Sequence, residues 1–272
     1  MLEGKTCMVT GANSGLGRET ALALAEMKAN VVMVCRNREK GEAARAEISK
    51  KSGNESVDLL LSDLSSLAEV RTLAAEAKNR YGELHVLVNN AGLFSFSGRT
   101  DDGFETTFAV DYLAPFLLTN LLIGLLKASA PSRIVNVSSV AHFNGHVDLE
   151  AVKRGGVATG WGAYSNSKLA LVMFTYELAR RLAGTGVTAN CLHPGAVATS
   201  IWRVPPALVR PFLKGAKEGA ETSVYLASSP EVEGVTGKYF EDKAPKRSSE
   251  ESYDEKEALA LWEVTAKVVG LP

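Results

Sequence analysis

Apolar and polar positions along the chain follow two alternating patterns. Short runs rich in β-branched residues are apolar throughout, as in Val31–Cys35, which is typical of strands buried on both faces of a parallel sheet. Longer segments with apolar residues every three or four positions lie between these runs and predict helices. The predicted strands are Thr6–Thr10, Val31–Cys35, Val57–Leu61, His85–Asn89, Arg133–Val137, Val187–Leu192 and Lys238–Phe240. The predicted helices include Gly15–Lys28, Lys40–Lys51, Leu67–Tyr81, Gly103–Lys127 and Tyr164–Ala183.

This alternation predicts an α/β fold: a doubly wound parallel sheet with right-handed crossovers and helices on both faces. The chain contains no internal repeat and no low-complexity linker, so residues 1–272 are interpreted as a single domain. The polar segment Glu241–Lys256 predicts a solvated loop. An amphipathic pattern then predicts a C-terminal helix around 254–269, which either docks on the domain or binds a partner protein.

Composition narrows the class of protein. Of the 272 residues, 46% are hydrophobic and 22% are charged, which excludes a disordered or collagen-like chain. The 30 basic and 31 acidic residues leave a formal net charge of -1. The chain therefore has no overall field for nucleic acid, and no nucleic-acid partner is expected.

The cysteines and the first residues of the chain indicate where in the cell the protein is located. Cys7, Cys35 and Cys191 each lie in an apolar run, and buried free thiols indicate a reducing compartment. The segment Met1–Lys5 begins no long apolar stretch, so no secretion signal is expected. No window reaches about 18 uninterrupted apolar residues, so no transmembrane segment is expected. These observations favour a cytoplasmic location.

A glycine-rich turn links the first predicted strand to the first predicted helix. Glycines lack the Cβ atom that would keep a pyrophosphate away from the backbone, and a helix start offers free N–H groups and the positive end of its dipole. Because the turn lies between a strand and a helix, we interpret it as dinucleotide-binding rather than as an ordinary connection. The residues assigned to it are Gly11, Asn13, Ser14, Gly15, Leu16 and Gly17.

The end of the second predicted strand indicates which cofactor is bound. Sites for NAD commonly have an acidic residue about 20 residues beyond the glycine-rich turn, where it binds the ribose 2′-hydroxyl. This chain has Cys35, Arg36 and Asn37 there instead. The guanidinium of Arg36 can pair with a 2′-phosphate, so the sequence favours NADP(H). The alternative is that Arg36 is only a surface residue after a strand.

Tyr164 and Lys168 lie four residues apart on a predicted helix, so their side chains share one face. A neighbouring cation favours the phenolate form of a tyrosine, and such a phenol can give a proton to a carbonyl or take one from an alcohol. The spacing alone is common on helix surfaces. Ser139, however, follows the predicted strand Arg133–Val137, and the carboxyl ends of parallel strands line the ligand crevice. Together these residues predict an active site.

These motifs resemble those of the short-chain dehydrogenase/reductase family, in the family's order and over nearly the whole chain. Within the family, the segments Cys35–Asn37, His193–Gly195 and Leu261–Glu263 and the long interval 139–164 are similar to the retinol dehydrogenase-like branch. The matching motifs are Thr10-Gly11-x-x-x-Gly15-x-Gly17, Asp63-Leu64, Asn89-Asn90-Ala91-Gly92, Ser139, Tyr164-x-x-x-Lys168 and Pro194-Gly195.

The resemblance implies a Rossmann-type fold and a role for each matching residue. Tyr164 would be the acid/base, Lys168 would favour its phenolate and bind the nicotinamide ribose, and Ser139 would orient the substrate oxygen. Asp63 would contact the adenine, and Thr199 would bind the carboxamide. The cofactor carries the hydride chemistry, and the protein supplies orientation and proton transfer. The further cofactor-binding residues implied are Leu64, Asn89, Ala91, Gly92, Pro194 and Gly195.

One residue departs from the family pattern. The family often has an Asn in the helix before the catalytic strand, and this chain has Asp111. An ionised Asp only accepts hydrogen bonds, whereas Asn also donates. Asp111 is retained as a catalytic relay residue acting through its backbone carbonyl and a water, with the alternative that its charge near Lys168 opposes the phenolate. Pro115 is expected to add a local kink.

Apolar residues near the predicted site favour a hydrophobic carbonyl or alcohol substrate. Phe94, Phe96 and Trp161 are candidates for the pocket, and residues 200–215 are apolar enough for a mobile lid. The alternative is that these residues pack the core beneath loops. No metal site is expected, because the histidines between Ser139 and Tyr164 lie in a glycine-containing loop without a complete ligand set.

The sequence thus predicts an NADP(H)-dependent oxidoreductase that interconverts a carbonyl and an alcohol. The alternative function is a catalytically idle dinucleotide-binding sensor or scaffold, although such a protein would usually lose Tyr164 or Lys168. The family often buries the helices matching Gly103–Lys127 and Tyr164–Ala183 in a homo-oligomer interface, and the sequence does not separate this from core packing.

Overall fold

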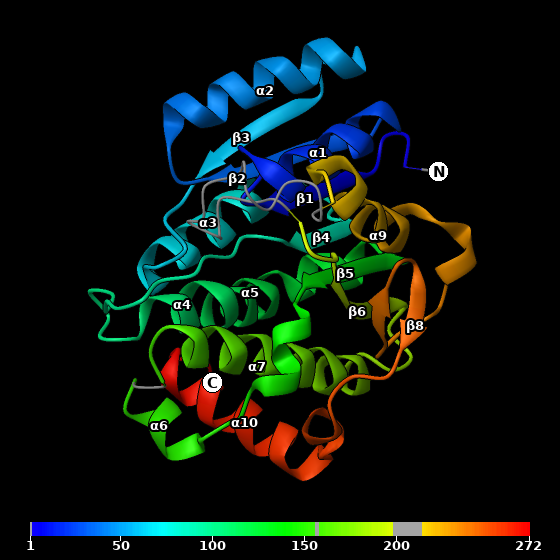
Figure 1. Ribbon diagram of the computed structural model, residues 1–272. Helices are drawn as coiled ribbons and strands as arrows, with labels where there is room; N and C mark the ends of the chain where they lie inside the picture. Colours follow the sequence, from blue (N-terminus) through cyan, green and yellow to red (C-terminus); the bar gives the residue numbers. More distant parts are fainter. Residues whose placement is uncertain (1, 156–157, 198–213) are drawn as a thin grey trace.

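The computed structural model describes residues 2–155, 158–197 and 214–272. Within these residues the strands form one eight-stranded sheet in the order β3-β2-β1-β4-β5-β6-β7-β8, and only the pair β7 and β8 is antiparallel. The order reverses direction after β1, which makes the sheet doubly wound, as predicted (Figure 1). The strands are β1 (Thr6–Thr10), β2 (Asn30–Cys35), β3 (Val57–Leu61), β4 (Val86–Asn89), β5 (Ser132–Val137), β6 (Val187–His193), β7 (Tyr239–Glu241) and β8 (Ala244–Lys246).

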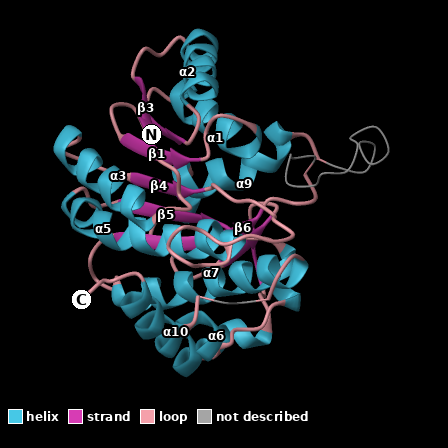
Figure 2. Cartoon of the chain, turned by 90° about the vertical axis from the view of Figure 1, so that its left-hand side faces the viewer, coloured by secondary structure: helices cyan, strands magenta, loops and turns pink. Residues whose placement is uncertain are grey.

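Helices cover both faces of the sheet (Figure 2). Successive side chains of a strand point to opposite faces, so neighbours in sequence enter different cores. Met8 and Val32 pack in the core covered by α3, α5 and α7, whereas Cys7 and Val31 pack in the core covered by α1, α2 and α9. The helices are α1 (Gly15–Glu26), α2 (Arg38–Ser52), α3 (Leu67–Arg80), α4 (Thr106–Phe108), η1 (Ala109–Leu113), α5 (Ala114–Ala128), η2 (Val140–Asn144), α6 (Leu149–Lys153), α7 (Trp161–Arg181), α9 (Ala216–Ser228), η4 (Pro230–Val232), η5 (Glu250–Tyr253) and α10 (Glu255–Val268).

The prediction of a solvated loop over Glu241–Lys256 is wrong in part. The segment contains β8, which pairs with β7 at the edge of the sheet, and the short helix η5. β8 is three residues long and includes Pro245, so it carries no alternation of apolar and polar residues that would reveal a strand. Helix α9 is also absent from the predicted elements, because most of its buried positions are small residues rather than large apolar ones.

The predicted helix Gly103–Lys127 begins later and is not uniform. It runs through α4, the π-helical turn η1 and α5. Pro115 is the second residue of α5, two positions after the end of the π-helical turn, so the irregularity expected at the proline takes the form of a widened turn shortly before it. Thr106–Ala128 is long and apolar enough to cross a membrane by length and composition alone, but 72% of its most apolar window is buried inside the fold, as in a core helix.

The C-terminal helix α10 docks on α7 and on the start of α5. The Trp262 ring lies 4.9 Å from the Phe116 ring and 5.6 Å from the Phe174 ring, measured between centroids. The hydroxyls of Tyr112 and Thr265 are hydrogen-bonded at 2.8 Å. The helix predicted around 254–269 therefore covers the α5 and α7 face of the domain.

Candidate active site

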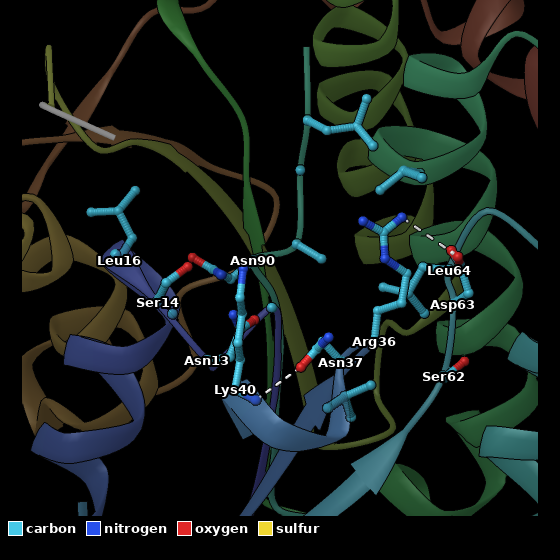
Figure 3. A pocket seen from close by; sticks show the side chains of 18 residues that line it. Asn13, Ser14, Leu16, Arg36, Asn37, Lys40, Ser62, Asp63, Leu64 and Asn90 are labelled. Carbon is cyan, nitrogen blue, oxygen red and sulfur yellow. Dashed lines mark hydrogen bonds and ion pairs between the residues drawn. The ribbon is translucent and has the colours of Figure 1, made fainter. Parts of the chain in front are cut away.

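A pocket of about 310 Å³ opens at the carboxyl ends of β1, β2, β3 and β4, and Figure 3 shows the side chains that line it. The structure thus brings the six predicted turn residues together with six other predicted cofactor residues that lie far apart in the sequence. The lining residues are Gly11, Asn13, Ser14, Gly15, Leu16, Gly17, Val34, Arg36, Asn37, Lys40, Ser62, Asp63, Leu64, Asn90, Ala91, Gly92, Leu93 and Val110.

The glycine-rich turn has a geometry that fits a diphosphate. Gly11 and Gly15 have positive φ angles of 67° and 55°, which side chains rarely adopt. A Cβ at Gly17 would lie 2.4 Å from the carbonyl oxygen of Gly11, so only glycine fits there. Helix α1 begins after Ser14 with no side-chain cap and no acidic residue in its first turn. Its first N–H groups are therefore free to bind an anion.

Two basic side chains, Arg36 and Lys40, also line this pocket: Lys40 lies beside Asn13 and Asn90, and Arg36 lies beside Asp63 (Figure 3). Arg36 pairs with Asp63 at 3.5 Å, and the Arg36 side chain is 72% exposed. Asn37 accepts a hydrogen bond from the Lys40 backbone N–H at 2.9 Å and so caps α2, which holds Lys40 at the pocket. Burial opposes ionisation of Asp63, but hydrogen bonds from Ser65 and the charge of Arg36 lower the pKa of Asp63 overall.

Sequence reasoning missed Lys40, although a signal for it was present. Lys40 lies in the first turn of the helix that follows Arg36, so both cations face the same pocket. Ser62, one residue before Asp63, was also missed.

Asn89 is the last residue of β4 and Asn90 follows it, and their side chains lie in different surroundings. Asn89 was assigned to the cofactor from the sequence, but its amide is buried and donates to Thr119 at 3.0 Å and to Asn136 at 2.8 Å. Asn90 lines the pocket instead, and its amide donates to the carbonyl oxygen of Thr10 at 2.8 Å. Because side chains alternate along a strand, the two neighbours take separate roles: Asn89 braces the core, and Asn90 braces the glycine-rich turn.

The predicted catalytic residues lie beside this pocket. Lys168 is buried in α7, and its ammonium donates to the carbonyl oxygen of Val137 at 3.1 Å. A Cβ at Gly92, a pocket residue, would lie 3.4 Å from the Lys168 Nζ atom. The Ser138 hydroxyl donates to the Lys168 carbonyl oxygen at 2.9 Å and ties the end of β5 to α7. The Lys168 ammonium is thus held at the wall of the pocket.

Tyr164 and Ser139 are both nearly buried, at 5% and 7% exposure. Tyr164 is one helical turn before Lys168 on α7, and the Lys168 Nζ lies 5.5 Å from the centre of the Tyr164 ring. Ser139 follows β5, and its hydroxyl accepts a hydrogen bond from the Ala141 N–H at 3.2 Å. The spacing predicted for Tyr164 and Lys168 therefore does place them on one side of the helix.

Aromatic side chains surround Tyr164. The ring centroids of Phe94 and Trp161 each lie 5.8 Å from that of Tyr164, and Phe96 packs edge-on against Phe94. Phe96 is 70% exposed and Trp161 is 45% exposed, so part of this aromatic surface faces solvent. The arrangement offers an apolar surface next to the phenol.

His142 holds the segment after Ser139, a role that the sequence did not indicate. Its Nδ1 lies 2.7 Å from the Ser139 carbonyl oxygen, and its Nε2 accepts a hydrogen bond from the Ser249 N–H at 3.1 Å. Since Nε2 accepts, Nδ1 carries the proton and donates to Ser139. Burial lowers the pKa of His142 and favours this neutral form.

Several predicted residues are not part of the described pocket. Pro194 and Gly195 follow β6, and within the described residues neither lines the pocket at the glycine-rich turn. Gly195 has a φ of 86°, and a Cβ there would lie 2.8 Å from the Lys214 side chain. Thr199 and residues 200–213 of the predicted lid lie outside the described residues.

The fold and the site define a dinucleotide-binding α/β protein with a Ser-Tyr-Lys arrangement beside the pocket. The family model for short chain dehydrogenases matches residues 5–205. The chain therefore belongs to the short-chain dehydrogenase family, whose members are oxidoreductases that use a nicotinamide dinucleotide, and the predicted family is confirmed.

Relatives and solved structures agree with this assignment. Human retinol dehydrogenase 14 is 45% identical over 100% of this chain and 88% of its own length. Mouse retinol dehydrogenase 13 is 43% identical over 99% of this chain and 85% of its own length. A crystal structure of an uncharacterised Mycobacterium paratuberculosis protein is 33% identical, with a TM-score of 0.82 over 99% of this chain and 95% of that one. The Pseudomonas aeruginosa RhlG/NADP complex is 26% identical, with a TM-score of 0.72 over 88% and 94%.

Proposed function

We propose that this protein is an NADP(H)-dependent oxidoreductase that interconverts a carbonyl and an alcohol on a hydrophobic small molecule. The observation that carries the proposal is the position of Lys168, which lies one helical turn from Tyr164 and against the pocket wall at Gly92. The relatives named retinol dehydrogenases suggest a retinoid-like alcohol or aldehyde as the substrate.

The residues of the pocket fit a phosphorylated dinucleotide. The glycine-rich turn and the uncapped start of α1 would hold the diphosphate, and Arg36 and Lys40 would face a 2′-phosphate. Asp63 and Leu64 would line the adenine side. Lys168, whose ammonium lies against Gly92, would bind the nicotinamide ribose. When bound, the cofactor supplies or accepts the hydride.

The protein's own residues would orient the substrate and move the proton. The Ser139 hydroxyl would hold the carbonyl or alcohol oxygen, and the Tyr164 hydroxyl would donate a proton to that oxygen in reduction or take it in oxidation. The positive charge of Lys168 would favour the phenolate that oxidation requires. Phe94 and Trp161 would bind the apolar body of the substrate and keep water from the reacting atoms.

Replacing the phenol tests the mechanism directly. We expect Tyr164→Phe to lower kcat/KM for aldehyde or ketone reduction by roughly a hundred- to ten-thousand-fold, with NADPH binding kept. Tyr176→Phe is the matched control, because Tyr176 is also a buried tyrosine of α7 and its hydroxyl bonds Ser248 instead. A panel that includes retinal, measured through NADPH consumption, provides the readout. Unchanged turnover in Tyr164→Phe would exclude this role.

The cytoplasmic location also stays a proposal. Cys7, Cys35 and Cys191 are free and buried, and burial raises the pKa of each thiol, which suits a reducing compartment. Fractionation of cells that express the chain would test this location.

The alternative function is a catalytically idle dinucleotide-binding sensor or scaffold. Cofactor binding without turnover on any carbonyl would favour this alternative over the oxidoreductase.

A further inference from the structure

Asp111 lies in the π-helical turn η1 and is completely buried. Its Oδ1 accepts a hydrogen bond from the Leu93 N–H at 2.8 Å, and its Oδ2 lies 3.0 Å from the Lys168 Nζ. A carboxylate accepts hydrogen bonds but does not donate them, and both oxygens here face donors. These two contacts therefore favour the ionised form of Asp111, whereas its burial opposes ionisation.

Asp111 and Lys168 interact as an ion pair. The Lys168 ammonium directs its aligned hydrogen bond to the Val137 carbonyl oxygen, and it meets Asp111 as an ion pair. Burial alone would lower the pKa of Lys168, but the Asp111 carboxylate outweighs this and the pKa is raised. Complete burial raises the pKa of Asp111. The charge of Lys168 and the hydrogen bond from the Leu93 N–H act in the opposite direction.

Few other titratable groups face this pair within the described residues. Tyr164 faces Lys168 from the preceding turn of α7. Glu105, which caps α4, faces Asp111, and burial raises the pKa of Glu105. The loop after β4 presents Gly92 and Leu93 to the pair, and neither is titratable. Within the described residues, the carboxyl group in contact with Lys168 is therefore that of Asp111.

This pairing changes what Lys168 can do for the phenol. A lone buried ammonium would attract the phenolate strongly, because the interior screens charges poorly. A carboxylate 3.0 Å from that ammonium carries the opposite charge and so offsets part of the attraction at a third group one helical turn away. A neutral Asn in the same place would leave the charge of Lys168 uncompensated.

We infer that Asp111 is a positioning residue that offsets the charge of Lys168, so that the Tyr164 hydroxyl stays protonated at neutral pH. This inference rests on the proposed function. A protonated phenol is the form that donates to a carbonyl, so the arrangement sustains carbonyl reduction at neutral and mildly alkaline pH. Alcohol oxidation, which needs the phenolate to accept a proton, is moved to higher pH.

The test compares pH profiles of the parent and Asp111→Asn, with kcat measured in both directions on one alcohol and aldehyde pair. We expect the rise of oxidation with pH, and the fall of reduction, to move to lower pH by on the order of one pH unit in the variant. Asp111→Glu, which keeps the charge, should restore the parent's midpoint. Glu105→Gln is the matched control, since it removes a buried carboxylate that does not contact Lys168.

A second readout does not need turnover. The absorbance of the Tyr164 phenolate is obtained as the difference between each protein and its Tyr164→Phe version during a pH titration. We expect the phenolate to form at lower pH in Asp111→Asn than in the parent. If neither protein turns over any carbonyl, the proposed function fails while this titration still tests Asp111.

A midpoint that is unchanged or moved to higher pH in Asp111→Asn would overturn the inference. Thermal unfolding and cofactor binding check that the variant is folded. If Asp111→Asn does not fold, Asp111→Ser removes the same charge with a smaller side chain, and the same shift to lower pH is expected. An Asp111→Ser midpoint equal to that of the parent would overturn the inference equally.

Discussion

The guanidinium of Arg36 lies 3.5 Å from the carboxylate of Asp63, at the rim of the pocket that also holds Lys40. Arg36 is 72% exposed, and exposed ion pairs contribute little to stability. Arg36 can therefore turn from Asp63 to a phosphate at little cost. This makes the pair a means of testing the cofactor preference without disturbing the fold.

We predict that Arg36→Leu weakens NADPH binding by at least tenfold and leaves NADH binding nearly unchanged, because only NADPH presents a 2′-phosphate to the guanidinium. Dissociation constants from fluorescence titration provide the measurement. Arg45→Leu, at an exposed arginine of α2 that pairs with Glu42, is the control. Equal loss of affinity for both cofactors in Arg36→Leu would refute the phosphate role.

Lys40→Met should act in the same direction with a smaller effect. Lys40 lines the pocket and carries one rotatable charge, whereas Arg36 can form a bidentate contact. We expect a loss of several-fold in NADPH affinity that decreases as salt is raised, since an exposed charge contact is screened. Lys51→Met, on the last turn of the same helix and paired with Glu47, should leave affinity unchanged. A salt-independent loss would point to a structural effect.

The sequence predicted the sheet and the placement of Tyr164 and Lys168 on one side of a helix because these depend on patterns local in the chain. Val31–Cys35 is apolar throughout, and Tyr164 and Lys168 share a helix face by spacing alone. What it did not predict depends on contacts between distant segments. The link from His142 to Ser249 is such a contact. For Asp111, the sequence indicated a charge near Lys168 but not the ion pair at 3.0 Å.

The difference between Asn89 and Asn90 shows another limit of prediction from the sequence. A strand places neighbouring side chains on opposite sides, so an error of one position moves a residue from the pocket to the core. The motif contains both residues, and only the register of β4 against β5 shows that Asn89 faces Asn136. The motif thus identified the segment, and the backbone determined which side chain lines the pocket.

Gly17→Ala should disrupt the glycine-rich turn. A Cβ there would lie 2.4 Å from both the Gly11 carbonyl oxygen and the Asn90 Nδ2, and backbone cannot move aside cheaply. We expect a loss of about 1–3 kcal/mol in the free energy of unfolding and a loss of dinucleotide binding. Gly124→Ala in α5 is the control: no atom lies within 4 Å of its Cβ, so alanine should be neutral or slightly stabilising. Urea unfolding of both variants, with a cofactor titration, tests this; full binding by Gly17→Ala would contradict it.

Stability should fall as the pH drops, in part through His193. Burial lowers the pKa of His193 from 6.5 to about 4, so the unfolded chain takes up a proton before the folded protein does. The contribution is present above pH 6.5 and is lost as the pH falls toward about 4. Between about pH 7 and about pH 5 it amounts to about 2 kcal/mol. Urea unfolding should show a smaller pH slope in His193→Gln than in the parent. Equal slopes in the two proteins would assign the acid sensitivity to other groups.

Trp262 contributes to the docking of α10, so we expect its replacement to affect stability and self-association. Its ring packs on Phe116 and Phe174, and the Arg181 guanidinium lies 4.2 Å from its centre. Because Trp262 is half-buried, we expect Trp262→Ala to lower the free energy of unfolding by about 2–3 kcal/mol, near the lower end for removal of an aromatic side chain. Loosening α10 would also uncover the apolar face of α5 and α7, so the variant should self-associate more than the parent in sedimentation experiments. Leu259→Ala, at a 42% exposed position of the same helix, is the control and should change neither quantity appreciably. Parent-like stability in Trp262→Ala would mean that these ring contacts do not hold α10 on the domain.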